Sequence, residues 1–170
     1  MDDERMDDER MDDYERPASR VDLQRVSLWT EISEGFQSTT RLLNRAVTEA
    51  FTLDAGEANV LLLLFRSEEG RLAMTHLANE IGFSSGGLTK LGARLAERGL
   101  VERASDSKDR RIVYLQLTDD GRTIGNDLCC LISSVVQSTW EDVLTDEQIA
   151  GLASAMTVLR KRDPKALLER

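Results

Sequence analysis

Apolar residues recur along the 170-residue chain at two different spacings. Spacings of three and four are typical of amphipathic helices, and they predict six helices over residues 20–51, 54–66, 76–81, 84–98, 118–144 and 145–161. Between the fourth and fifth helices the spacing changes to two, which predicts strands at 100–103 and 112–117 around a charged loop at 104–111. The pattern therefore indicates a mainly α fold with one small β-hairpin.

Residues suited to helix ends stand at the predicted boundaries. Side chains that accept hydrogen bonds from backbone N–H groups precede four of the helices, at Asp54, Thr75, Ser84 and Thr145. Gly82 and Gly99 follow the third and fourth helices, where a left-handed residue ends a helix. The third and fourth helices, joined by a tight turn, form a helix-turn-helix, and the hairpin after it is a wing. We therefore expect a winged helix-turn-helix fold.

The charge of the chain is unevenly distributed. A formal net charge of −9 argues at first against a nucleic-acid partner, because binding to phosphate depends on Lys and Arg. Residues 1–20 hold nine acids and four arginines, whereas residues 71–111 hold eight basic residues and five acids. The helix-turn-helix and wing therefore carry a net charge of +3, and the acidic surplus lies elsewhere.

Other functional classes find little support in the sequence. The longest uninterrupted apolar run covers residues 60–65, far short of the roughly 20 residues of a membrane span, so we expect a cytoplasmic protein. Cys129 and Cys130 are adjacent within a predicted helix and are expected to be buried, inert thiols. His76 is the only histidine and has no neighbour at ligand spacing, so no metal site, cofactor or enzymatic centre is expected.

The sequence of the helix-turn-helix and wing closely resembles that of one protein family. Residues 77–103 read LANEIGFSSGGLTKLGARLAERGLVER, followed by DSKDRR at 106–111 and LTDDG at 117–121. This stretch resembles the multiple-antibiotic-resistance regulator (MarR) family, tightly over residues 72–122. The usual wing of the family is Asp-Pro-x-Asp-Arg-Arg, and Ser107 replaces its proline here. The resemblance implies a transcriptional regulator, usually a repressor, that binds double-stranded DNA.

The candidate DNA contacts lie in two segments. A recognition helix presents its N-terminal and outward side chains to the major groove, which points to Ser84, Ser85, Gly86, Gly87, Thr89, Lys90 and Arg94. A long arginine at a hairpin tip can enter an A·T-rich minor groove. The resemblance gives this role to Arg111, with Lys108 and Arg110 at the phosphates or holding the loop.

The remaining helices present more apolar surface than a small DNA-binding domain can cover. The resemblance implies that they form a two-fold homodimer, which places two recognition helices roughly 34 Å apart on a pseudopalindrome. The expected organisation is an acidic repeat tail at 1–19, disordered or frayed, a dimerisation helix at 20–53, a winged helix-turn-helix at 54–122 and C-terminal dimerisation helices at 123–170.

The resemblance also implies a small effector that releases the DNA. Relatives commonly bind an aromatic or phenolic anion between the dimerisation helices and the DNA-binding lobe, and Trp29, Asn59 and Arg66 loosely fit a urate-responsive pattern. Asn59 stands where that pattern has an aspartate. Two alternatives remain open: a protein-interaction module turned from DNA by its acidic balance, and a regulator that senses oxidation through Cys129 or Cys130.

Overall fold

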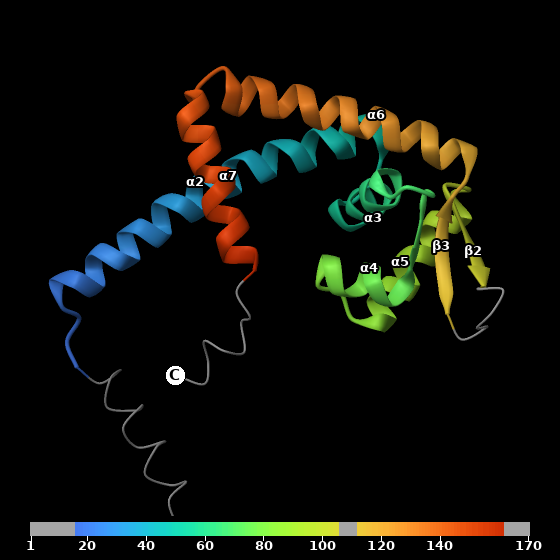
Figure 1. The fold of residues 1–170 in the computed structure, drawn as a ribbon, viewed down its shortest axis with the longest axis horizontal. Helices are drawn as coiled ribbons and strands as arrows, with labels where there is room; N and C mark the ends of the chain where they lie inside the picture. Colours follow the sequence, from blue (N-terminus) through green and yellow to red (C-terminus); the bar gives the residue numbers. More distant parts are fainter. Residues whose placement is uncertain (1–15, 106–111, 162–170) are drawn as a thin grey trace, which may run out of the picture. The chain divides into compact units, whose positions relative to one another are not determined.

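The computed structural model describes residues 16–105 and 112–161 (Figure 1). The chain divides into two compact units, and the boundary between them falls after Thr40, inside the long helix α2 (Arg20–Phe51). The first unit holds the N-terminal part of α2, and the second holds the end of α2 and every later element. Among the described residues, no helix is both long and apolar enough to cross a bilayer.

Helix α2 begins at Arg20 because two side chains cap its first turn. The Ser19 N–H donates to Asp22 Oδ2 at 2.8 Å, and the Asp22 N–H donates to Ser19 Oγ at 3.2 Å. A hydrogen bond from Arg16, together with those from Ser19, holds the pKa of the Asp22 carboxyl well below its usual range. The cap is therefore lost only when the pH falls below the range in which an ordinary aspartate titrates.

The part of α2 in the first unit leaves its apolar side chains exposed. This helix has the expected three-and-four spacing, yet the described residues of its own unit do not cover the apolar side. Its large exposed side chains are Val21, Leu23, Val26, Leu28, Trp29, Ile32 and Phe36. Trp29 is the most exposed of them, at 71%.

The described part of the second unit, residues 41–105 and 112–161, contains five further α-helices and a small sheet. In chain order its elements are α3 (Ala55–Arg66), β1 (Arg71–Ala73), α4 (Met74–Ile81), α5 (Ser85–Glu97), β2 (Val101–Ser105), β3 (Val113–Leu117), α6 (Asp119–Val136), the π-helical turn η1 (Gln137–Glu141) and α7 (Asp146–Arg160). The described residues thus confirm the predicted six helices and the winged helix-turn-helix order.

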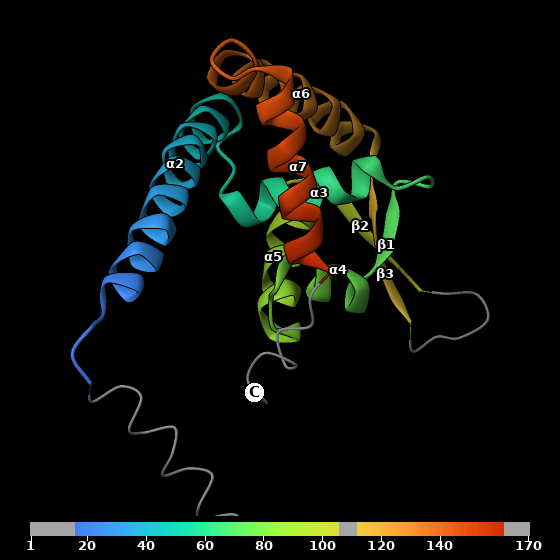
Figure 2. The same ribbon diagram turned by 60° about the vertical axis from the view of Figure 1, so that its left-hand side comes forward.

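The sheet has three strands, of which only two were predicted. Its order is β1-β3-β2, and both pairings are antiparallel, with Leu115 opposite Leu72 on one side and Arg103 on the other (Figure 2). Strand β1 escaped prediction because three residues are too few to show an alternating pattern. It also displaces the predicted start of the third helix. Ala73 leads from β1 directly into α4, so Thr75 lies within the helix instead of capping it.

One buried cluster joins the elements of the second unit. Leu88, Leu91 and Leu95 of α5 are between 0% and 3% exposed and pack with leucines of α3, α4, α6 and β3. The predicted caps at Asp54, Ser84 and Thr145 each accept the expected backbone hydrogen bond, and Gly82 and Gly99 are left-handed, with φ of 67° and 71°. These boundaries fix which face of each helix meets the core.

Helix α6 ends earlier than the apolar pattern indicated. It stops at Val136, and the chain continues as the π-helical turn η1, in which the Asp142 N–H donates to the Gln137 carbonyl at 3.0 Å. The insertion of a π turn does not disturb the apolar spacing enough to be recognised in sequence.

The two cysteines of α6 differ in exposure. Cys129 is half-buried and Cys130 is exposed, so the expectation of two buried thiols is wrong for Cys130.

Gly121 offers a test of the packing between α6 and the end of the helix-turn-helix. A methyl group there would lie 1.9 Å from the Leu100 carbonyl oxygen, whereas one at Gly151 would meet open space. We expect Gly121→Ala to lower the free energy of unfolding by roughly 3 kcal/mol, because backbone has to move. Gly151→Ala should instead raise it by up to about 1 kcal/mol. Urea titration measures both, and equal midpoints would contradict the close approach.

Candidate nucleic-acid interface

Helix α5 buries one face and exposes the opposite one. Its leucines Leu88, Leu91 and Leu95 lie in the core, which turns Ser85, Gly86, Thr89 and Lys90 toward solvent. We call these four residues the exposed face of α5. The helix begins at Ser84, whose Oγ accepts from the Gly87 N–H at 3.1 Å. The remaining N–H groups of the first turn favour negative charge nearby.

The two glycines at the start of α5 differ in their surroundings. A methyl group at Gly87 would lie 3.2 Å from Ser84 Oγ and 3.3 Å from the Phe83 ring, so this glycine makes room for the cap. A methyl group at Gly86 would meet nothing within 4 Å. Packing inside the chain therefore does not explain Gly86. A glycine on an open surface also allows a partner to approach the backbone closely.

The Thr89 hydroxyl is already committed as a donor. It donates to the Ser85 carbonyl at 2.8 Å, which leaves the lone pairs of its oxygen available to accept hydrogen bonds. Arg103, from β2, donates to the Thr89 carbonyl at 3.0 Å. The wing is thus tied to the middle of α5, and the exposed face of α5 presents acceptors as well as the single ammonium of Lys90.

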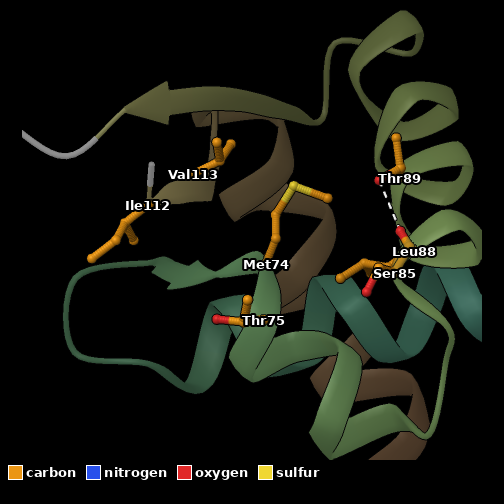
Figure 3. Close-up of a pocket in the computed structure, with 7 residues that line it drawn as sticks. All are labelled: Met74, Thr75, Ser85, Leu88, Thr89, Ile112 and Val113. Atoms are coloured by element: carbon orange, nitrogen blue, oxygen red, sulfur yellow. Dashed lines mark hydrogen bonds between the residues drawn. The ribbon is translucent and has the colours of Figure 1, made fainter. Parts of the chain in front are cut away.

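A shallow pocket of about 260 Å³ lies beside the exposed face of α5. Figure 3 shows Met74 projecting from the start of α4 between β3 and α5, with Thr75 and Ser85 at the rim. Its lining consists of Met74, Thr75, Ser85, Leu88, Thr89, Ile112 and Val113. These residues carry hydroxyls and apolar groups, so the lining contains no side-chain cation that could pair with a phosphate or a carboxylate.

Arg94 lies on the flank of α5 that faces the start of α3. Its guanidinium pairs with the Asp54 carboxylate, and its Nε donates to Glu57 Oε1 at 3.0 Å. The hydrogen bond to Glu57, followed by the charge of Asp54, raises the pKa of Arg94. Arg98, one turn later, lies 3.7 Å from Glu57 Oε2. Arg94 therefore has partners within the chain, and its contact with DNA stays a prediction.

These ion pairs change the charge estimate made from the sequence. The net +3 of residues 71–111 counts Arg94 and Arg98, but both are matched by acids of α3 that lie outside that window. Arg71 is paired with Glu69 as well. Lys90 forms no ion pair with any described residue. The surplus of positive charge thus resides in Lys90, in Arg103, whose described hydrogen bond goes to a neutral carbonyl, and in the predicted wing contacts.

The predicted wing contacts Lys108, Arg110 and Arg111 lie outside the described residues. The flanking strands are described, and Ser105 pairs with Val113 at the end of the hairpin where the two strands are connected. At this end of the sheet Val113 of β3 lines the pocket beside α5. The roles of the three side chains stay predictions.

Comparison with known proteins agrees with this geometry. Residues 52–112 match the model of the MarR family. The transcriptional regulator AdcR of Streptococcus pneumoniae is 35% identical over 80 residues, which make up 47% of this chain and 53% of that protein. The chain spans about half the length of the curated relatives it matches, or somewhat less.

Solved structures extend the similarity of fold to most of the chain. AbsC, a MarR family transcriptional regulator from Streptomyces coelicolor, has a TM-score of 0.76 and 22% identity, covering 91% of this chain and 99% of its own. A mutant MarR from E. coli complexed with operator DNA has a TM-score of 0.69 and 25% identity, covering 83% and 99%. Over residues 52–112 this chain is therefore similar to the MarR family, and its fold is that of MarR-family regulators.

The candidate effector residues are divided between the two compact units of the chain. Asn59 and Arg66 are exposed on α3, whereas Trp29 belongs to the other compact unit. None of the three lines the pocket beside α5. A shared site for these residues stays a prediction. The acids Asp54 and Glu57 were missed as partners of Arg94, because nothing in the sequence connects positions some 40 residues apart.

The different surroundings of Arg94 and Lys90 can be tested by removing each charge. We expect Arg94→Met to lower the thermal unfolding midpoint, because the buried Glu57 carboxylate loses a charged hydrogen bond. Lys90→Met removes an exposed, unpaired cation and should leave the midpoint within about 2 °C of wild type. Scanning calorimetry compares the two variants, and equal midpoints would show that Arg94 is not engaged as described.

Proposed function

We propose that this chain is a MarR-family transcriptional regulator that binds a pseudopalindromic DNA operator as a homodimer. The observation that carries the proposal is the exposed face of α5, which is held outward by a buried leucine face and lies next to a wing. A helix of this kind fits the major groove, where hydroxyl and backbone groups can read base edges. The operator complex of the similar MarR supports the same use of the fold.

The described contacts support different tasks for the predicted DNA-binding residues. Ser85, Gly86 and Thr89 lie where base edges would pass, and Lys90 supplies a free charge for phosphate. Ser84 and Gly87 build the cap that orients the first turn. Arg111 remains the candidate for the minor groove, with Lys108 and Arg110 beside it. Arg94 holds α5 in place through its ion pairs with Asp54 and Glu57, and a contact with DNA phosphate requires these ion pairs to break.

The homodimer follows from the apolar surface that the single chain leaves uncovered. In the first unit the side chains of α2 from Val21 to Phe36 are exposed, and in the second unit Met156, Val158 and Leu159 of α7 are exposed as well. Exposed apolar surface of this extent is typical of protein interfaces. We therefore retain the predicted division into dimerisation segments at 20–53 and 123–170 around a DNA-binding segment at 54–122.

A small effector that releases the DNA is part of the proposal, as is the absence of enzymatic activity. An aromatic or phenolic anion, bound near Trp29, Asn59 or Arg66, is the class that the sequence indicates. The exposure of Cys130 favours the alternative of a thiol-sensing regulator, because oxidation of a thiol requires access to solvent. The acidic net charge of −9 favours the alternative of a protein-interaction module. We place the regulator in the cytoplasm.

The salt dependence of binding tests the part played by Lys90. A DNA duplex selected by the wild-type protein from a random pool serves as the probe. We expect Lys90→Ala to reduce the slope of log K against log salt by about 1.8, which corresponds to one phosphate contact in each protomer of the dimer. Lys161→Ala removes the same charge beyond the end of α7 and should leave the slope unchanged. Failure of the wild type to prefer any duplex over random DNA would overturn the proposed function.

The proposed homodimer can be disrupted by one charge in the first unit. Sedimentation of the wild type should give twice the 19.1 kDa mass of the chain. Phe36→Glu places a carboxylate among exposed apolar side chains and should shift the protein toward the monomer, because burying an unpaired charge is costly. Gln37→Glu adds the same charge at a neighbouring polar position and should remain dimeric. A monomeric wild type would contradict the arrangement.

A further inference from the structure

The turn between α2 and α3 holds a residue in a strained conformation. Thr52 has a φ of 55° and is the only residue other than glycine with a positive φ in the described ranges. For a β-branched residue this conformation is unfavourable, because the branched side chain collides with the backbone. Such a residue persists only where neighbouring contacts force it to. The contacts around Thr52 therefore indicate which interactions hold the turn in this conformation.

The main contacts on this turn come from the recognition helix. Arg98, at the C-terminal end of α5, donates through NH1 to the Thr52 carbonyl and through NH2 to the Phe51 carbonyl, both at 2.9 Å. The neighbouring Leu53 is 1% exposed, and its carbonyl accepts from Thr48 Oγ1 at 3.1 Å. The planar guanidinium thus spans two successive carbonyls of the turn, which a single ammonium group cannot do in the same way.

Glu57 ties the same arginine to the start of α3. Its side chain is only 8% exposed, and both of its oxygens are used. Oε1 accepts from Arg94 at 3.0 Å, while Oε2 accepts from the Asp54 N–H at 3.0 Å and lies 3.7 Å from Arg98. A nearly buried carboxylate with two cationic partners is held in one geometry, because losing a partner leaves its charge uncompensated.

We propose that Thr52, Glu57, Arg94 and Arg98 form a joint, the α2–α5 joint, that sets the orientation of the recognition helix relative to the last turns of α2. Arg98 and Glu57 are then positioning residues for DNA binding, although neither contacts the DNA. The inference rests on the proposed function. The two hydrogen bonds from Arg98 hold the turn in its strained conformation. Without them the turn relaxes, and α5 is free to shift.

The arginines of the α2–α5 joint lie outside the hydrophobic core, so their positioning role differs from that of the buried leucines. The leucines of α5 are buried with the main cluster independently of Arg94 and Arg98, which lie on the flank of the helix. Arg94 follows Lys90 by one helical turn and borders the exposed face of α5, whereas Arg98 lies one turn further toward the C-terminal end of the helix. The joint therefore has little to do with whether α5 forms, and mainly determines how it is held.

A double-mutant cycle between Arg98→Met and Thr52→Gly tests the joint. Glycine adopts a positive φ without strain, so Thr52→Gly should raise the thermal midpoint, whereas Arg98→Met should lower it. Arg98→Met should lower the midpoint less in the Thr52→Gly background than in the wild type, because a glycine at position 52 does not need the hydrogen bonds from Arg98 to hold its conformation. Additive midpoints would overturn the claim that Arg98 holds the strained turn.

The same proteins are then titrated with the duplex selected by the wild type and with a scrambled duplex. We expect Arg98→Met to weaken binding to the selected duplex roughly tenfold with little change on the scrambled one, and Thr52→Gly to restore most of the affinity. Arg98→Lys keeps the charge but cannot span both carbonyls, so it should behave like Arg98→Met. Wild-type affinity in Arg98→Met would overturn the positioning role.

Leu128→Ala serves as the stability control. It removes a fully buried side chain of α6 that has no part in the joint, so it should lower the midpoint while leaving the affinity at 25 °C unchanged. Equal losses of affinity in Leu128→Ala and Arg98→Met would show that Arg98→Met weakens binding only by destabilising the fold, and would overturn the proposal. If the wild type prefers no duplex, the proposed function fails, and the cycle of thermal midpoints still decides whether Arg98 holds the turn.

Discussion

The burial of one face of α5 is the constraint on which the rest of the structure depends. Leu88, Leu91 and Leu95 are almost inaccessible, and removing such side chains from water stabilises a fold by about 1.5–3 kcal/mol each. Once this face is fixed, helical geometry sends Ser85 and Lys90 to the opposite side. The presentation of a recognition surface is therefore a consequence of core packing.

Electrostatics around α5 divide into an internal and an external part. Arg94 and Arg98 are matched by Asp54 and Glu57, and their charge holds elements of the chain together. Lys90 is unmatched among the described residues and remains available to a partner. A count of basic residues along the sequence mixes these two groups. This explains how an acidic chain can still present a locally positive surface, and why that surface is smaller than the count indicates.

The apolar pattern predicted the architecture well wherever an element was long enough to show its period. Helix α2 and helix α3 have nearly the predicted bounds, and the capping residues Asp54 and Ser84 act as expected. The errors fall at short or irregular elements. Strand β1 has three residues, and its pairing with β3 decides that α4 begins at Met74 and not after a cap at Thr75. The π turn after α6 is likewise invisible in the spacing of apolar residues.

Taken alone, the sequence determined the elements, their caps, the leucine face of α5 and the resemblance of residues 72–122 to one family. These features depend on neighbours within a few positions, where periodicity and side-chain chemistry act directly. Only the tertiary structure decided that Arg94 and Arg98 reach Glu57 and the Thr52 turn. Such pairs join positions some 40 residues apart, and their distance in space depends on how the helices pack, which local patterns do not encode.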